Sequence, residues 1–240
     1  MILPLQVGQI ESVKRVFTQA DFDRFAALSG DDNPIHVDAA FSAQTKFGRP
    51  VAHGMFLYSV VCSVLGTRLP GPGTVQLEQE LMFPSPTYAG EEVAIQVEVT
   101  RVAEGLADLN TVVIRPDGEV GLQGRTLVRL PGVTDFGGFE KPPKSEHDTP
   151  GDVSLKGLKI GQRAETRRAF TIRDLAEYAD FTGDTNPIFT DASFARQLGL
   201  AGPMIPGGLL GSLFSYLLGT ELPGLGTNYL KQRLEFVTPA

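Results

Sequence analysis

The sequence is short of cysteine, of basic charge and of long apolar runs, and each shortage excludes a class of protein. Cys62 is the only cysteine among 240 residues, so an intrachain disulfide and a cysteine-based metal cluster are both excluded. Lysine and arginine number 21 against 28 acidic residues, which gives a formal net charge of −7. Proteins that bind nucleic acid usually carry a basic face, so this balance argues against a nucleic-acid partner.

The apolar content points to a globular protein outside the membrane. No apolar stretch is much longer than about twelve residues, which is too short to span a bilayer. The first residues do not resemble a signal peptide. Hydrophobic residues still make up 42% of the chain, enough for a core in each half. We therefore expect a cytoplasmic protein with no membrane partner.

The sequence is rich in internal repetition. Residues 28–87 align with residues 181–240 at a constant offset of 153, and 26 of the 60 aligned pairs are identical. A repeat this long indicates a duplicated domain, because solenoid units span roughly 20–50 residues. One difference is informative: the second copy has Phe189 where the first has His36. Loss of a titratable group from one copy predicts one working site and one retired site.

The first copy predicts a buried helix followed by an antiparallel sheet. Thr18 is placed to cap a helix that ends at Gly30. Pro34 disfavours helical geometry at the residue before it, so we expect Asp31–His36 to form a loop. Residues 53–66 are apolar on nearly every side, as in a helix buried all round. The remaining expectations are a short helix over 38–46 and strands near 9–17, 74–83, 91–102, 107–115 and 119–130.

The second copy repeats this order but stops earlier. We expect a linker over residues 131–158, where proline, glycine and charged residues dominate. The elements that follow are a strand near 162–170, a helix over 172–181, a loop over 183–189, a buried helix over 207–219 and a strand over 227–236. Counterparts of the last three strands are missing. We therefore expect either about 45 further residues or another chain covering the second helix. The side chains otherwise exposed are Leu209, Leu210, Leu213, Phe214 and Leu217.

The segment Ser-Gly-Asp-Asp-Asn-Pro-Ile-His-Val-Asp at residues 29–38 resembles the signature of MaoC-like dehydratases, the (R)-specific enoyl-CoA hydratase family. His53-Gly54-Met55 and the Leu-Pro-Gly at residues 69–71 also resemble that family. The resemblance implies an α+β architecture of tandem hot-dog domains, each an antiparallel sheet wrapped around a buried central helix. The domains would be a catalytic repeat at 1–130, the linker and a degenerate repeat at 159–240. It also implies a pseudo-dimer within the chain, or a homo-oligomer.

The residue types at this motif suit the addition of water to a double bond conjugated to a thioester. That reaction needs a base for water, an acid for C2 and a donor for the thioester oxygen. Asp31 and His36 lie five residues apart on a loop pinned by Asn33-Pro34, so both can face one water. Gly54 opens the buried helix with a free N–H at the positive end of the helix dipole. The resemblance implies these same roles.

Other residues are candidate substrate-binding groups, and each has a structural interpretation beside the functional one. They are Asn33, His53, Tyr58 and Phe189. Asn33 is retained in both copies, which favours a structural role. His53 could line the site or serve only the start of the helix, and Tyr58 could touch the acyl chain or only pack in the core. We expect Phe189 to fill the space of the missing water and part of the acyl groove.

Asp31 and His36 also have structural alternatives, as a loop cap and a buried core histidine. Cys62 is more typical of core packing than of a nucleophile. The related family often has serine at this position, as the second copy does at Ser215.

The leading functional hypothesis is a hydratase that interconverts trans-2-enoyl-CoA and (R)-3-hydroxyacyl-CoA in fatty acid metabolism. The resemblance implies no metal, nucleotide or redox cofactor, and an acyl-CoA thioester as the small-molecule partner. Two alternatives stay open: a non-catalytic subunit that binds acyl thioesters, and an acyl-carrier-protein dehydratase or thioesterase of the same fold. Carrier proteins are acidic, so that alternative needs a basic docking patch, for which Lys46, Arg49 and Arg68 are the candidates.

Overall fold

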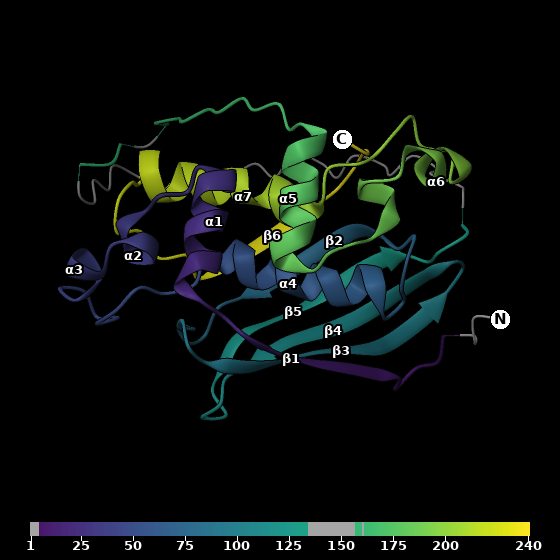
Figure 1. The fold of residues 1–240 in the computed structure, drawn as a ribbon, viewed down its shortest axis with the longest axis horizontal. Coiled ribbons are helices and arrows are strands. Elements are labelled where there is room, and N and C mark those ends of the chain that lie inside the picture. The colour runs from purple at the N-terminus through teal and green to yellow at the C-terminus, as the bar shows by residue number, and fades with distance from the viewer. Residues whose placement is uncertain (1–4, 134–156, 160) are drawn as a thin grey trace.

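The computed structural model describes residues 5–133, 157–159 and 161–240, so most of the expected linker at 131–158 lies outside the described residues. An antiparallel sheet forms one layer, and helix α4 (Gly54–Thr67) lies across one face of it (Figure 1). Helices α1 (Gln19–Ser29), α5 (Ile172–Thr182) and α7 (Gly207–Tyr216) form a further layer over α4. No helix among the described residues is long and apolar enough to cross a bilayer.

The first repeat contains the five strands that the sequence predicts, and its predicted helices with one addition, α2. Thr18 accepts a hydrogen bond from the backbone N–H of Asp21 and donates its own N–H to the Asp21 carboxylate, so the expected helix cap is present. The helices are α1 (Gln19–Ser29), α2 (Pro34–Val37), α3 (Ala39–Ser42) and α4 (Gly54–Thr67). The strands are β1 (Ile10–Val16), β2 (Val75–Met82), β3 (Glu92–Ala103), β4 (Leu106–Ile114) and β5 (Val120–Arg129).

Two local predictions in this repeat need correction. The segment 31–36 is not a loop throughout, because Pro34–Val37 forms the single helical turn α2. Proline is well suited to the first position of a helix, where its missing N–H costs nothing, and the preceding Asn33 caps the turn from outside it. The helix expected over 38–46 is also shorter, since α3 ends at Ser42.

Helix α4 is buried all round, as predicted. Eleven of its fourteen residues are buried, including Met55, Phe56 and Tyr58, each with no exposed surface. The sheet residues that pack against it alternate along β3, where Val93, Ile95, Val97 and Val99 point inward. A helix enclosed in this way places its first residue, Gly54, at the edge of the core.

The second repeat contains α5 (Ile172–Thr182), the 3-10 turn η1 (Pro187–Phe189), α6 (Ala192–Gln197), α7 (Gly207–Tyr216), the π-helical turn η2 (Leu217–Glu221) and β6 (Lys231–Glu235). The strand predicted near 162–170 is not formed. Its counterpart β1 is held by hydrogen bonds to β3. No described strand of the second repeat corresponds to β3, so residues 162–170 have no partner for a ladder.

The two repeats join into one six-stranded sheet of order β1-β3-β4-β5-β2-β6. Strand β2 pairs antiparallel with β6, which is its own counterpart, and Glu80 lies opposite its counterpart Arg233. The hydrogen bonds on either side of this pair are also equivalent. Phe83 N–H donates to Leu230 O at 3.0 Å, and the counterpart of Phe83, Phe236, donates its N–H to the counterpart of Leu230, Leu77 O, at 2.8 Å. The repeats are therefore related by an approximate two-fold axis through this strand pair.

Helix α7 is only partly covered. Phe214 is 53% exposed, as expected for a helix without a full sheet of its own. The prediction that Leu209 is exposed is wrong, since it is fully buried, and Leu210, Leu213 and Leu217 are half-buried. Helix α4 covers the buried side of α7. The two helices pack closely because Gly208 and Gly211 of α7, which have no side chains, face Ser59 and Met55 of α4.

Candidate active site

A cavity of about 280 Å³ opens between the two repeats at the N-terminal end of α4. We call it the working cavity. The first repeat contributes Asp31, Asn33, His36 and Gly54, together with Phe83 at the end of β2. The second repeat contributes Ser215 of α7, Leu218 and Gly219 of η2, and residues 227–230 before β6. Neither repeat alone encloses the cavity.

Asp31 is placed by the end of α1. Gly30 caps that helix in the left-handed conformation, with φ of 82°, and turns the chain toward α4. The Asp31 side chain is buried, with a residue exposure of 1%. Its Oδ2 accepts a hydrogen bond of 2.5 Å from the hydroxyl of Ser215, and its Oδ1 accepts a long one of 3.4 Å from Asn33 N–H. The carboxylate is thus held by one donor from each repeat.

His36 is oriented by a single hydrogen bond to the backbone. Its Nδ1 lies 2.8 Å from the carbonyl oxygen of Val51. A carbonyl only accepts, so Nδ1 carries the proton and Nε2 keeps a free lone pair. Burial lowers the pKa of His36 from its ordinary value, against the opposing effects of the Asp31 charge and the Val51 hydrogen bond. The imidazole is therefore neutral at neutral pH and ready to accept a proton.

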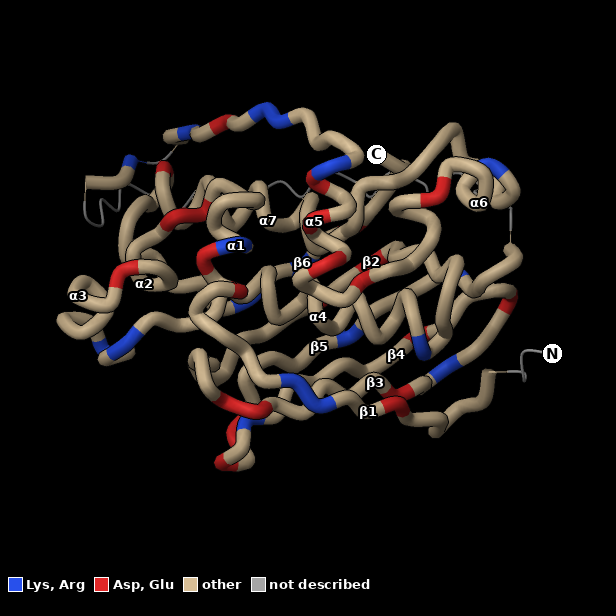
Figure 2. The backbone as a smooth tube through the Cα atoms, in the orientation of Figure 1, with Lys and Arg blue, Asp and Glu red and all other residues tan. Residues whose placement is uncertain are grey.

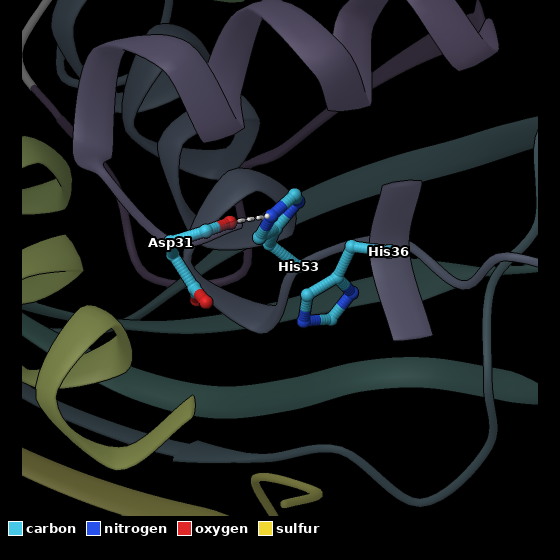
Figure 3. Close-up of side chains that lie close together, drawn as sticks. All are labelled: Asp31, His36 and His53. Carbon is cyan, nitrogen blue, oxygen red and sulfur yellow. Dashed lines mark hydrogen bonds between the residues drawn. The ribbon is translucent and has the colours of Figure 1, made fainter. Parts of the chain in front are cut away.

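The Asp31 carboxylate and the His36 ring face the same space (Figure 3). An oxygen of Asp31 and a ring nitrogen of His36 lie within 4.8 Å of each other. Two hydrogen bonds of about 2.8 Å that meet at one water fit such a separation. The pair therefore offers two acceptors to a single water molecule inside the cavity.

His53 lies beside this pair but does not line the cavity. Its ring stacks on that of His36 with centroids 3.8 Å apart and planes inclined by 26°. Its Nε2 donates to the main-chain oxygen of Asp31 at 2.9 Å, which Figure 3 draws as the dashed line. Burial, and next the neighbouring His36, lower the pKa of His53 well below its ordinary value. The arrangement makes His53 a support for the loop that carries Asp31.

Asp31, His36 and His53 are also the one group of described residues with close metal-ligand atoms. A metal ion lies close to the plane of each imidazole that binds it. The stacked, nearly parallel rings of His36 and His53 do not direct their lone pairs to a common point. This geometry fits a metal ion poorly.

Gly54 contributes its backbone to the cavity wall. It is the first residue of the 14-residue helix α4, and no described residue accepts a hydrogen bond from its N–H. A Cβ at this position would come within 2.8 Å of the Phe83 ring. Glycine therefore allows the close packing of Phe83 here, and the free N–H lies at the positive end of the helix dipole.

Asn33 bridges the two repeats with its side chain. Its Oδ1 accepts from Gly226 N–H at 3.0 Å, and its Nδ2 donates to Thr227 O at 3.1 Å. Asn186 makes the equivalent pair of bonds to Gly73 and Thr74. Both amide ends of Asn33 are engaged in this way, which favours the structural interpretation of a residue that also lines the cavity.

The second repeat has a counterpart of this cavity that is almost filled. We call it the retired cavity. Its volume is about 20 Å³, and it is lined by Phe189, Gly207, Leu210 and Phe236, the counterparts of His36, Gly54, Leu57 and Phe83. Gln76 of the first repeat lines it as well. Phe189 belongs to a small buried apolar cluster with Val75, Leu77 and Ile188.

The carboxylate on the retired side has lost its hydroxyl donor. Asp184 is the counterpart of Asp31, and Cys62 stands where Ser215 stands on the working side. Burial raises the pKa of Asp184 to about 7. The Cys62 sulfur accepts from Gln76 Nε2 at 2.9 Å, and Tyr58 donates to Gln76 Oε1 at 2.8 Å. Burial raises the pKa of the Cys62 thiol and of the Tyr58 hydroxyl.

The predicted residues therefore divide between the two sides. Asp31, Asn33, His36 and Gly54 meet at the working cavity. Tyr58 and Phe189 belong to the retired side and do not line the working cavity. Sequence reasoning missed Ser215, Gly219 and the segment 227–230. The internal alignment contained a signal for Ser215, since two-fold symmetry exchanges the central helices and brings the serine of one copy to the aspartate of the other.

Comparison with known proteins identifies the family. The model of the MaoC-like domain matches residues 7–115 and 156–240. This chain belongs to the MaoC-like domain family. The (R)-specific enoyl-CoA hydratase of Aeromonas caviae is 43% identical over 129 residues, which are 53% of this chain and 96% of that protein. The 3-hydroxybutyryl-CoA dehydratase of Methylorubrum extorquens is 39% identical over 128 residues, which are 53% of this chain and 82% of that protein.

Solved structures agree with the hot-dog architecture. The structure of the A. caviae (R)-hydratase superposes with a TM-score of 0.52 at 42% identity, over 54% of this MaoC-like chain and 99% of that one. A MaoC-like dehydratase structure superposes with a TM-score of 0.72 at 22% identity, over 98% of this chain and 83% of that one. The second match shows the fold alone, and it spans both repeats. The α+β hot-dog prediction is confirmed.

Proposed function

We propose that this protein is a hydratase that interconverts trans-2-enoyl-CoA and (R)-3-hydroxyacyl-CoA. The observation that carries the proposal is the pair of Asp31 and His36, two buried acceptors that face one cavity within 4.8 Å of each other. The relatives named as an (R)-specific enoyl-CoA hydratase and a 3-hydroxybutyryl-CoA dehydratase support the same chemistry. They also support the assignment to the lyases.

In the proposed reaction, Asp31 and His36 hold the water by its two hydrogens. One of the pair takes a proton as the water oxygen bonds to C3. C2 then receives a proton from the pair, so both groups return to their starting protonation states. The neutral His36, with its pKa lowered by burial, suits this exchange at neutral pH. The dehydration direction uses the same steps in reverse.

The free N–H of Gly54 is the proposed donor to the thioester oxygen. As water adds to C3, negative charge develops on that oxygen. A donor already fixed at a helix N-terminus stabilises the charge without rearranging. A side chain at this position would meet Phe83, which lines the same cavity, so the glycine lets Phe83 pack beside the start of the helix.

The proposal divides the chain into a catalytic repeat at 1–130, a linker at 131–158 and a second repeat at 159–240 that completes the site. Ser215 would position the Asp31 carboxylate, and residues 227–230 would form one wall of the substrate groove. A cytoplasmic location is part of the proposal, and the free thiol of Cys62 is compatible with a reducing compartment.

The direct test is hydration of crotonyl-CoA by the purified protein, followed as loss of the ultraviolet absorbance of the conjugated thioester. We expect steady turnover and an (R)-3-hydroxybutyryl product on chiral chromatography. Asp31→Asn is the negative control. Binding of crotonyl-CoA without turnover would instead support the alternative of a non-catalytic subunit that binds acyl thioesters.

A further inference from the structure

Two charged side chains line the working cavity, and they are very differently exposed. Asp31 is 1% exposed, whereas Lys46 is an exposed residue. The other lining residues are uncharged, and several are apolar, such as Phe47, Leu57 and Phe83. The cavity thus runs from a buried carboxylate and imidazole to a single ammonium group at its exposed side.

Lys46 has no carboxylate partner among the described residues. The neighbouring cations are engaged, since Arg49 pairs with Glu91 at 3.2 Å and Arg115 pairs with the same carboxylate at 2.9 Å. The Lys46 ammonium lies 5.2 Å from the centroid of the Phe47 ring, which also lines the cavity. Figure 2 shows basic segments, drawn in blue, in the loop that follows α3. The formal net charge of the whole chain is −7.

The chemistry of a thioester substrate requires opposite properties at its two ends. The reacting enoyl group is neutral and must reach Asp31 and His36. The carrier arm bears phosphate groups and must leave through the exposed side. A cation at that side, without a carboxylate partner among the described residues, attracts an anion locally even though the net charge of the protein is negative.

We propose that Lys46 binds a phosphate group on the carrier arm of the thioester substrate, an inference that rests on the proposed function. The shared chemistry is a phosphate monoester or diester. Its source is either the phosphopantetheine arm, common to coenzyme A and carrier proteins, or the nucleotide part that only coenzyme A has. An exposed charge pair of this kind corresponds to an about fivefold change in affinity.

The test compares Lys46→Met with the wild-type chain on four crotonyl thioesters: those of coenzyme A, dephospho-coenzyme A, 4′-phosphopantetheine and pantetheine. We expect KM for crotonyl-CoA to rise about fivefold with kcat unchanged, and KM for crotonyl-pantetheine, which has no phosphate, to stay the same. Lys46→Arg should retain the wild-type KM. Lys14→Met is the control for net charge. Lys14 is an exposed lysine on the edge strand β1, where it pairs with Glu92 of β3, and it does not line the working cavity.

The other two thioesters locate the phosphate. An effect on crotonyl-phosphopantetheine assigns Lys46 to the arm. An effect on dephospho-CoA and CoA but not on phosphopantetheine assigns it to the diphosphate, and an effect on CoA alone assigns it to the 3′-phosphate. The proposal is overturned if Lys46→Met leaves KM for crotonyl-CoA unchanged or raises KM for crotonyl-pantetheine equally.

A failure of the proposed function is distinguishable from a failure of this inference. If the wild-type chain turns over none of the four thioesters, the hydratase assignment fails. Calorimetric titration with coenzyme A then decides the role of Lys46: weaker binding by Lys46→Met than by Lys14→Met supports it, and equal binding overturns it.

Discussion

The two cavities of this chain share a backbone design and differ in chemistry. The working cavity measures about 280 Å³ and the retired one about 20 Å³. On the working side, His36 and Ser215 lie next to Asp31. On the retired side, the equivalent positions around Asp184 are occupied by Phe189 and Cys62. The difference teaches that the aspartate and its loop serve the architecture on both sides. The histidine, the hydroxyl donor to the aspartate and the open space are present on one side only.

The largest expected effect comes from making the working side resemble the retired one. In His36→Phe the acceptor for the water is lost, so we predict that kcat for crotonyl-CoA falls by between about 10² and 10⁴. Phe189→His, the matched reverse change, should leave kcat within about twofold because its cavity holds little space. Steady-state kinetics measures both. A His36→Phe variant with more than a tenth of wild-type turnover would contradict the assignment.

The next effect concerns stability and the buried Asp184. Its pKa is raised from 3.8 to about 7, so between these values the folded chain binds a proton that the unfolded chain does not. Stability from this group is therefore present at low pH and is lost as pH rises through that window. Asp184→Asn does not titrate, so we predict that it is more stable than wild type at pH 8, by up to about 4 kcal/mol.

Denaturant unfolding at pH 5 and pH 8 measures this effect. The advantage of Asp184→Asn should be larger at pH 8. Cys62→Ser, which gives Asp184 the hydroxyl donor that Asp31 has, should show a smaller gain of the same sign. An advantage that is equal at both pH values would show that ionisation of Asp184 is not the cause.

A smaller effect is expected from the donor to Asp31. Ser215→Cys copies the retired side and replaces a hydroxyl with a weak donor. We predict an about tenfold loss in kcat/KM, because the buried Asp31 carboxylate loses the hydroxyl donor that fixes its orientation. Cys62→Ser, the change on the other side, should leave kcat/KM unchanged. An unchanged kcat/KM in folded Ser215→Cys would contradict a positioning role for this hydroxyl.

The parts of the fold that follow from local rules could be predicted from the sequence. The cap at Thr18 and Asp21, the apolar run of α4 and the alternation along β3 each depend on neighbouring residues. The strand expected near 162–170 is not formed, because a strand needs a partner and no described strand of the second repeat corresponds to β3. A pattern of residues does not contain that information.

In the candidate site, too, contacts between neighbouring residues could be predicted from the sequence, and contacts between the two repeats could not. Asp31 and His36 lie on one short segment, so their meeting could be predicted from spacing. Ser215 could not be placed in this way, because it comes from the other repeat through the two-fold axis between β2 and β6. The choice between substrate contact and core packing at Tyr58 could not be made from the sequence for a similar reason. Tyr58 lies on a helix buried on every side, and the sequence does not say which neighbour each face meets.

The most direct test of the central claim is turnover of crotonyl-CoA by the matched variants Asp31→Asn and Asp184→Asn. Both replace a buried aspartate with asparagine at equivalent positions, so comparing their turnover shows which of the two cavities carries the chemistry. The account predicts at least an about hundredfold loss of kcat for Asp31→Asn and a nearly unchanged kcat for Asp184→Asn. Equal losses in two folded variants would contradict it, since the second repeat would then take part in the chemistry through its own aspartate.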